Sequence, residues 1–302
     1  MADAVLDHAA ARPPAAARAE RRRRYAATLA ADQGARDRRW PLLVAYALVI
    51  AFFVIPLAYL VSVSFKTPDD VLSGRFLPTD PTLANWPAAF GATDLGRFIF
   101  NSVVASLASA FVTMAIAVPA TYAMVRLDVG GRVLPTFTLA TYMAPPVVAL
   151  IPLFFLLRQI GLLHTLPGLI LVYGLMNVPV AFWLLTGFIR QVPREIDEAA
   201  WIDGSGSWRT LVHIVVPLIA PGLAASFIIC AVLSYNEFLF AFFFTTDPSR
   251  TLTIGIALFQ GERLVNFGQM AAASVTGLVP VYIVAVVCQR WLVSGLVSGG
   301  VK

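Results

Sequence analysis

The residues from 166 to 204 read LPGLILVYGLMNVPVAFWLLTGFIRQVPREIDEAAWIDG. The first part, 166–189, is almost entirely apolar and is long enough to cross a bilayer, whose hydrocarbon core of roughly 30 Å takes about 20 residues of helix. The second part, 192–204, is polar, has the length of a short helix and is followed by another long apolar run. A polar helix held between membrane spans is expected to meet a protein partner rather than lipid. The stretch therefore predicts a membrane protein on which another protein acts.

The composition of the whole chain supports this class. Of 302 residues, 59% are hydrophobic and only 13% are charged, against roughly 25% charged residues in soluble domains. The net charge of +5 comes from basic residues gathered in the N-terminal stretch and in loops, so it indicates membrane orientation rather than nucleic-acid binding. Cys230 and Cys288 fall in apolar segments without histidine or acidic clusters, and we interpret them as buried hydrophobic residues, with no disulfide and no metal site.

The apolar segments predict an all-α integral membrane fold. Six of them are long enough to span a bilayer: 41–64, 98–125, 134–157, 166–189, 211–244 and 270–292. Residues 1–40 are predicted to be a mobile cytoplasmic tail, and 41–302 a six-span transmembrane domain with an outer loop at 65–97 and an inner loop at 190–216. The fifth segment is longer than one span needs, and Pro217 and Pro221 are expected to start it, with its membrane part beginning near Leu218.

The distribution of basic residues predicts how the spans are oriented. With both termini in the cytoplasm, 16 of the 22 arginines and lysines lie on the inner side and six lie in the outer loops, as the positive-inside rule favours. Nine of those 16 belong to the N-terminal tail. The tail therefore decides the orientation.

The polar stretch at 192–204 carries the signals of a short helix. Pro193 suits the first turn, where its missing N–H costs nothing, and Gly204 is placed to end the helix in a left-handed conformation. One face, at helical spacing, consists of Ile196, Ala199, Ala200 and Asp203. Two adjacent alanines on that face let another surface approach closely. An amphipathic helix lying on the bilayer is the alternative that these residues alone leave open.

The pattern Glu198-Ala199-Ala200-x-x-Asp203-Gly204, followed by Pro217, resembles the EAA loop of ABC importer permeases. The resemblance covers roughly residues 42–302 and is greatest with the carbohydrate branch, in particular with the second permease subunit of maltose-type systems. Shorter stretches add to it, among them YAMVRL at 122–127 and YNEF at 235–238. Three mild departures are Ser205, where alanine is usual, Leu211, where phenylalanine is common, and Val216, where leucine is usual.

The resemblance implies a cytoplasmic coupling helix between the fourth and fifth of six transmembrane helices. In that family this helix docks into a cleft of the ATPase subunit. By this resemblance the coupling residues are Glu198, Ala199, Ala200, Asp203, Gly204 and Pro217. It further implies a multi-pass subunit of the bacterial inner membrane that forms half of a sugar pathway. Its expected partners are a second permease subunit, two copies of an ATP-binding subunit and an extracytoplasmic solute-binding protein.

The chain itself contains no nucleotide-binding motif. Its only lysines, Lys66 and Lys302, lie outside any Gly-x-x-x-x-Gly-Lys-Ser/Thr phosphate loop. Mg-ATP is therefore expected in the partner ATPase, with no cofactor in this chain. We predict that the chain is not an enzyme, because it also lacks a catalytic constellation.

Polar residues in or near the spans are candidates for the solute pathway, since burying them in a membrane is costly and often functional. These candidates are Asn177, Tyr235, Asn236 and Glu237. A hydroxyl-rich solute would need such amide, carboxylate and aromatic groups. Two alternatives stay open. Asn177 can form a hydrogen bond between helices, and Glu237 can be a carboxylate at the outer boundary, about 30 Å along the fifth helix from Pro217.

A secondary transporter driven by a proton or sodium gradient is the other class of protein to consider. Such transporters usually show inverted repeats and buried ion-binding acids. Neither is clear here, because Glu237 is the only strong carboxylate candidate within a predicted span. A membrane-embedded enzyme is a third class, and the chain lacks a residue cluster for its chemistry.

Overall fold

The computed structural model describes residues 39–260 and 265–300, and every regular element in this part of the chain is a helix. Extended backbone pairs there only in an isolated bridge between Gln260 and Val265. The predicted N-terminal tail, 1–40, lies outside the described residues except for its last two. The chain divides into two compact units, Met1–Tyr59 and Leu60–Lys302, which are described separately.

In the first unit the structure describes residues 39–59, which form the first part of α2 (Arg39–Ser64). Almost all side chains from 40 to 58 are exposed, and most of them are large and apolar. A helix that is apolar on every side is typical of a membrane span that faces lipid. This helix matches the predicted span at 41–64.

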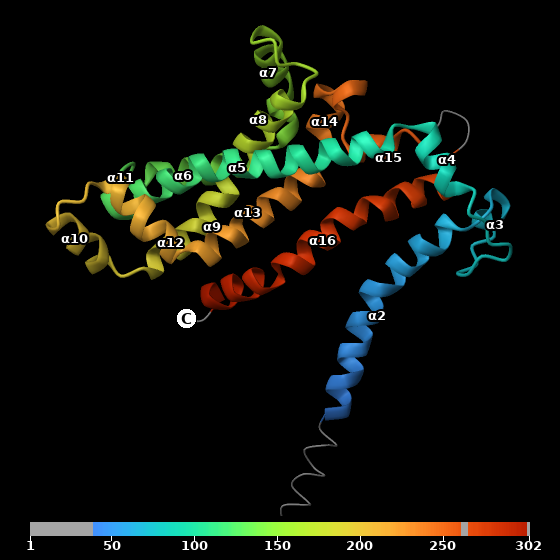
Figure 1. Cartoon of the computed structure of the whole chain (residues 1–302), viewed down its shortest axis with the longest axis horizontal. Coiled ribbons are helices and arrows are strands. Elements are labelled where there is room, and N and C mark those ends of the chain that lie inside the picture. The colour runs from blue at the N-terminus through green and yellow to red at the C-terminus, as the bar shows by residue number, and fades with distance from the viewer. Residues whose placement is uncertain (1–38, 261–264, 301–302) are drawn as a thin grey trace, which may run out of the picture. The chain divides into compact units, whose positions relative to one another are not determined.

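The second unit is built around α5 (Leu95–Leu127), whose 33 residues make it about 50 Å long. It packs against α8 (Leu166–Met176), α9 (Val178–Gln191) and α13 (Ala220–Tyr235), and Figure 1 shows α13 running beside it. The buried face of α5 is made largely of small residues, including Ala105, Ser109, Ala110, Thr113 and Ala117. Small side chains allow helices in membranes to approach closely.

The predicted span at 134–157 is not a single helix. It consists of α6 (Val133–Met143) and α7 (Pro146–Gln159), which meet at an angle of 96°. Two successive prolines cause the break, because a residue before proline is pushed out of the helical conformation. Ala144 has ψ 133° and Pro145 has ψ 127°, so both are extended.

The predicted spans at 166–189 and 211–244 are also broken. In the fourth, α8 and α9 meet at 46° around Asn177, two residues before Pro179, which has no N–H for the helix ladder. The fifth begins with α11 (Ser207–Thr210), the π-turn η1 (Leu211–Val215) and α12 (Val216–Leu218), and then bends by 84° into α13. Pro217 has no N–H to donate to the carbonyl four residues before it. The N–H of the preceding residue, Val216, donates to the carbonyl of Leu211, five residues back, which is the hydrogen-bond pattern of a π-helix.

The lengths and compositions of these helices allow up to six membrane crossings. Three helices qualify alone, namely α2, α5 and α16 (Phe267–Gly300), and each bent pair can supply one more crossing. The prediction of an all-α integral membrane fold is confirmed.

Short helices occupy the two ends of the second unit. One end holds α4 (Asn85–Ala92) and α15 (Leu252–Ala257), while α10 (Arg194–Ile202) and α11 lie at the opposite end of α5 (Figure 1). The remaining short helices are α3 (Pro68–Leu72), α14 (Leu239–Phe244) and η2 (Asp247–Ser249). The resemblance of residues 198–204 to the EAA loop assigns the contact with an ATPase to the end that holds α10.

Candidate functional site

The polar helix that the sequence predicts is α10, which follows α9 after a turn at 192–193. Gly204 has φ +83°, the left-handed conformation that was predicted for it. The N–H of Ser205 donates to the carbonyl of Ala200 at 2.9 Å, and the N–H of Gly204 donates to that of Trp201 at 3.0 Å. These two bonds form a Schellman motif, so the helix has a defined end.

The two sides of α10 differ in exposure. Asp197 is 1% exposed and Ala200 is 6% exposed, whereas Ile202 is 86% exposed. Glu198 and Ala199 are also exposed. The expectation that Ala199 and Ala200 form one accessible surface is wrong, because each residue of an α-helix is rotated by about 100° from the one before it.

A buried ion pair holds the inward side of α10. Nε of Arg126, near the end of α5, lies 3.0 Å from Oδ2 of Asp197, and both side chains are almost completely buried. The contact is an ion pair by distance, although this N–H does not point at the oxygen closely enough to count as a hydrogen bond. The hydroxyl of Tyr122, one turn earlier in α5, donates to Oδ1 of Asp197 at 2.9 Å.

The same arginine also holds the turn that leads into α10. Its NH2 group donates to the carbonyl oxygens of Ile189 at 3.0 Å and of Val192 at 2.5 Å. The guanidinium of Arg194, in the first turn of α10, donates in the other direction to the carbonyl of Val125 at 3.1 Å. Arg126 of α5 thus holds the end of α9 and the turn before α10, and Arg194 of α10 reaches the backbone of α5.

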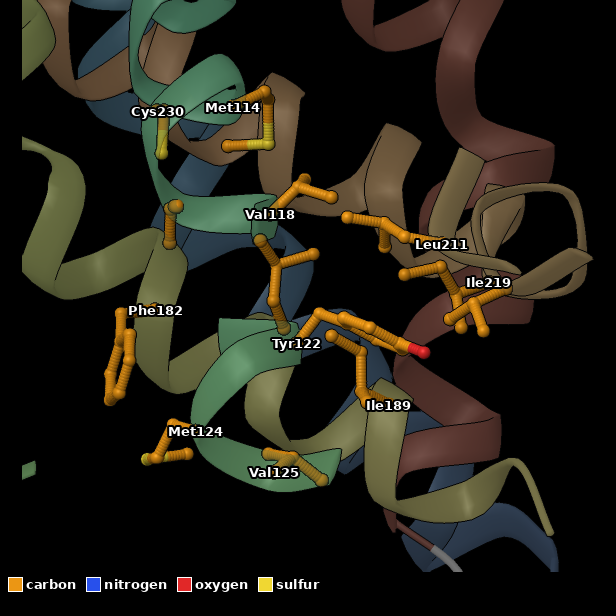
Figure 2. Close-up of a cluster of buried hydrophobic side chains, with 14 of the residues drawn as sticks. Met114, Val118, Tyr122, Met124, Val125, Phe182, Ile189, Leu211, Ile219 and Cys230 are labelled. Atoms are coloured by element: carbon orange, nitrogen blue, oxygen red, sulfur yellow. The ribbon is translucent and has the colours of Figure 1, made fainter. Parts of the chain in front are cut away.

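The Tyr122 ring belongs to an apolar cluster that joins α5 to α9 and to the start of the fifth span. Figure 2 shows Tyr122 among Val118, Ile189, Leu211 and Ile219. The sequence reasoning missed Tyr122, Arg126 and Asp197 as a connected group. The signal available was the spacing of Tyr122 and Arg126, which places both on one side of a helix at the end of a span.

Five of the six predicted coupling residues are exposed: Glu198, Ala199, Asp203, Gly204 and Pro217. Ala200 is the buried one. Four of the exposed five lie on α10 or at its end, whereas Pro217 lies in α12, just before the bend into α13. The motif is therefore divided between the helix and the beginning of the fifth span.

Among the predicted pathway residues, Asn177 lies at the break between α8 and α9. Its side-chain amide donates to Oγ of Ser234 in α13 at 2.8 Å, and Ser234 also accepts from Ser109 of α5 at 2.9 Å. Asn177 thus forms a hydrogen bond between helices, which is the alternative that the sequence left open for it. This bond gives the amide a partner at the point where the helix is interrupted.

Tyr235 and Asn236 are neighbours with different surroundings. Tyr235 is buried, and its hydroxyl donates to the carbonyl of Gly277 in α16 at 2.8 Å. The side chain of Asn236 is exposed and donates to the carbonyl of Val232, one turn back on its own helix. The structure therefore does not bring the two side chains to one site.

Glu237 does not lie within a helix, which corrects its predicted position in the fifth span. It stands in the break between α13 and α14, where its carboxylate accepts the backbone N–H groups of Phe240 at 3.1 Å and Ala241 at 3.3 Å. Free N–H groups at the start of a helix attract a carboxylate. The side chain is partly buried and serves to begin α14.

Metal ligands do not gather in the described part of the chain, where no group of three histidine, cysteine, aspartate or glutamate side chains is arranged to hold an ion. Cys230 and Cys288 are both free.

The sequence of residues 114–297 matches the family described as "Binding-protein-dependent transport system inner membrane component". The match covers more than half of the chain and includes α10. The chain belongs to this family. The resemblance to importer permeases that the sequence indicates is therefore confirmed.

Curated relatives align with this permease over most of its length. The sulfoquinovosyl glycerol transport system permease protein SmoH of Agrobacterium fabrum is 37% identical over 263 residues, covering 86% of this chain and 92% of that protein. The trehalose/maltose transport system permease protein MalG of Thermococcus litoralis is 32% identical, with 88% and 97% covered. The diacetylchitobiose uptake system permease protein NgcG of Streptomyces coelicolor is 34% identical, with 90% and 92% covered.

A solved structure has the same fold. A chain from a bacterial ABC transporter involved in the import of alginate superposes with a TM-score of 0.70 at 22% sequence identity. The superposition covers 84% of this permease and 96% of that chain.

Proposed function

We propose that this permease is the transmembrane subunit of an ATP-driven sugar importer, and that α10 is the helix that docks into a separate ATPase subunit. The observation that carries the proposal is the exposed side of α10, which holds Glu198 and Ala199 on a helix with fixed ends at one end of the bundle. Large apolar side chains lie exposed beside them, with Ile202 at 86% and Trp208 at 69%. Neighbouring exposed apolar and charged groups are typical of a surface that meets a protein.

The proposed solute is a sugar, either a mono- or oligosaccharide or a related polyol. The relatives SmoH, MalG and NgcG are named for the transport of sulfoquinovosyl glycerol, of trehalose and maltose, and of diacetylchitobiose, respectively. These solutes share hydroxyl-rich rings and differ in size and substituents. We therefore propose the chemical class and not one member of it.

The proposed assembly places this permease beside a second permease subunit, so that each forms half of the pathway. Two copies of an ATP-binding subunit carry Mg-ATP on the cytoplasmic side, and an extracytoplasmic binding protein delivers the solute. The subunit is proposed to lie in the bacterial inner membrane with both termini in the cytoplasm. The excess of arginine in the predicted inner segments supports this orientation.

In the proposed mechanism, the ATPase subunits close on one another when they bind ATP, and the segment 198–204 moves with them as a rigid lever. The membrane helices then change from an inward-open to an outward-open arrangement. We keep the pathway candidates as part of this proposal. Asn236, which is exposed, and Asn177 and Glu237, which are partly exposed, are the three that are accessible to a passing solute.

Co-purification tests the proposal directly. Tagged permease is extracted in mild detergent, and mass spectrometry identifies the proteins that stay bound. We expect an ATPase with Walker motifs, and we expect Glu198→Lys to remove it, because the substitution reverses a charge on the proposed docking surface. Asp80→Lys makes the same change at an exposed position in the 65–97 loop and should retain the ATPase.

The contrary outcome is recovery of this permease without an ATPase, together with uptake that an ionophore abolishes and ATP depletion does not. That result would favour a secondary transporter. Retention of the ATPase by a well-expressed Glu198→Lys variant would instead contradict only the assigned docking surface.

A further inference from the structure

We propose that the buried group Tyr122–Arg126–Asp197 is the joint through which movement of α10 passes into α5 and thereby into the membrane helices. The inference rests on the proposed function and adds the path that the movement takes inside this subunit. Arg126 and Asp197 are positioning residues in this account. They touch neither solute nor nucleotide, and they act through the helix that they hold.

Burial of the pair indicates a positional role rather than a large gain in stability. The side chains of Arg126 and Asp197 are only 3% and 2% exposed. Removing two charges from water costs about as much as their attraction returns, so a buried pair often stabilises no more than well-packed apolar residues would. Charged hydrogen bonds do, however, hold a fixed direction and distance, and the pair makes them to its neighbours, from Tyr122 to Asp197 and from Arg126 to the carbonyls of Ile189 and Val192. Together with the ion pair, these bonds define where α10 lies relative to α5.

Arg126 connects three parts of the chain at one point. It stands in the last turn of α5, pairs with Asp197 of α10, and donates to the carbonyls of Ile189 and Val192 on either side of the end of α9. Arg194 makes the reverse connection from α10 to the carbonyl of Val125. The Arg126–Asp197 pair and the bond from Arg194 to Val125 thus join α5 and α10 at two points, so a turn or slide of α10 against the end of α5 strains both.

Apolar packing adds to this connection at one residue, since Ile196 of α10 packs against the cluster that contains Tyr122 and Val125 of α5. Within the described residues, the helix that α10 lies along is α11. Two clefts flank the turn into α10, one of about 660 Å³ and one of about 390 Å³, and Val192 and Pro193 line both. The turn is therefore open on two sides, and Arg126 and Arg194, which line the larger of these two clefts, connect α5 to α10 beside it.

Helix α5 is well placed to pass a displacement of α10 on to other helices. Beyond its last turn, α5 packs along α8, α9 and α13, which include parts of both the fourth and fifth spans. Tyr122 ties the joint to this core, since its ring is buried in the apolar cluster (Figure 2). Its hydroxyl donates to Asp197. A shift of α10 thus reaches three helices through one residue pair.

The test measures whether α10 and the end of α5 move together. Spin labels are placed on Glu195→Cys and Leu127→Cys, two exposed positions, after Cys230 and Cys288 have been replaced by serine. Electron paramagnetic resonance then reports the distance between the labels in the complex with its ATPase subunits, without nucleotide and with Mg-ATP and vanadate. We expect one narrow distribution that is the same in both states.

Three variants and two controls separate the joint from general structural damage. Asp197→Asn and Arg126→Gln should broaden the distance distribution and make it depend on nucleotide, while ATP hydrolysis continues. Tyr122→Phe keeps the buried ring and removes only the hydroxyl, so it provides a milder variant where the others fail to assemble. Asp128→Asn and Arg190→Gln remove the same charges at exposed positions close by and should leave the distribution unchanged.

Two results would overturn the inference. One is a wild-type distance that shifts with nucleotide, which means that α10 moves independently of α5. The other is an unchanged distribution in assembled Asp197→Asn and Tyr122→Phe complexes. A wild-type preparation that contains no ATP-binding subunit would contradict the proposed function itself, and the two failures are therefore distinguishable.

Discussion

Single charged residues shape the 65–97 loop. Lys66 is fully buried, and its ammonium group donates to the carbonyl of Arg75. The carboxylate of Asp70 accepts the backbone N–H of Thr79 at 2.8 Å and the hydroxyl of Thr79 at 2.9 Å. The backbone hydrogen bond from Thr79 is the main reason why the pKa of Asp70 lies below its ordinary value, and it outweighs burial, which acts in the opposite direction.

We expect the hydrogen bonds from Thr79 to the Asp70 carboxylate, which hold this part of the loop together, to weaken in acid. Because the pKa of Asp70 is lower in the folded state, the carboxylate contributes stability above the unfolded-state pKa of about 3.9, and the contribution is lost as the pH falls through the folded-state value. Hydrogen–deuterium exchange of residues 65–80, corrected for intrinsic rates, should accelerate between about pH 6 and about pH 3.

Two variants control this prediction. Asp70→Asn should exchange fast at both pH values, because the ionised acceptor is gone. Asp69→Asn changes the exposed neighbour and should keep the wild-type response. Identical pH responses in the wild type and Asp70→Asn would contradict the assignment to Asp70.

Among the helices, close contact between α8 and α5 depends on a glycine. A Cβ atom built at Gly174 would lie 2.6 Å from Cγ1 of Val112, whereas one built at Gly187 in α9 would meet nothing within 4 Å. The hydroxyl of Thr113 donates to the carbonyl of Gly174 at 2.8 Å, which shows how near the two backbones are. Both glycines lie inside helices, so they differ mainly in the space around them.

Replacing Gly174 with alanine should therefore destabilise the permease, by about 1–3 kcal/mol as for overpacked cores. Gly187→Ala should cause no loss of stability, because alanine is the better helix former. Thermal unfolding of the purified protein in detergent measures the difference. Equal melting temperatures for the two variants would show that the α5–α8 contact relaxes easily.

For the molecule as a whole, orientation in the membrane can be tested at two exposed positions. In a protein without its native cysteines, Leu72→Cys should react with a membrane-impermeant maleimide added outside intact cells, since residue 72 is 80% exposed in the predicted outer loop. Val129→Cys, 54% exposed in the turn after α5, should react only after permeabilisation. The basic residues predict this pattern, and the reverse labelling would mean that the N-terminal arginines do not set the topology.

The membrane class, the helical fold, the position and end of α10, and the family could all be predicted from the sequence. These properties depend on local composition and spacing. Apolar runs of sufficient length must form helices in a bilayer to satisfy their backbone groups, and Gly204 ends α10 because a left-handed residue is needed there.

The bend angles, the different exposure of Ala199 and Ala200, and the pairing of Arg126 with Asp197 could not be predicted, because they depend on how the helices pack. The prolines at 145, 146, 179, 217 and 221 show where a helix is interrupted, but the angle depends on what the two halves pack against. Tyr122 and Asp197 are 75 residues apart, and nothing in the local pattern of either indicates the other. Their contact exists because α5 and α9 pack side by side and bring the end of one helix to the start of α10.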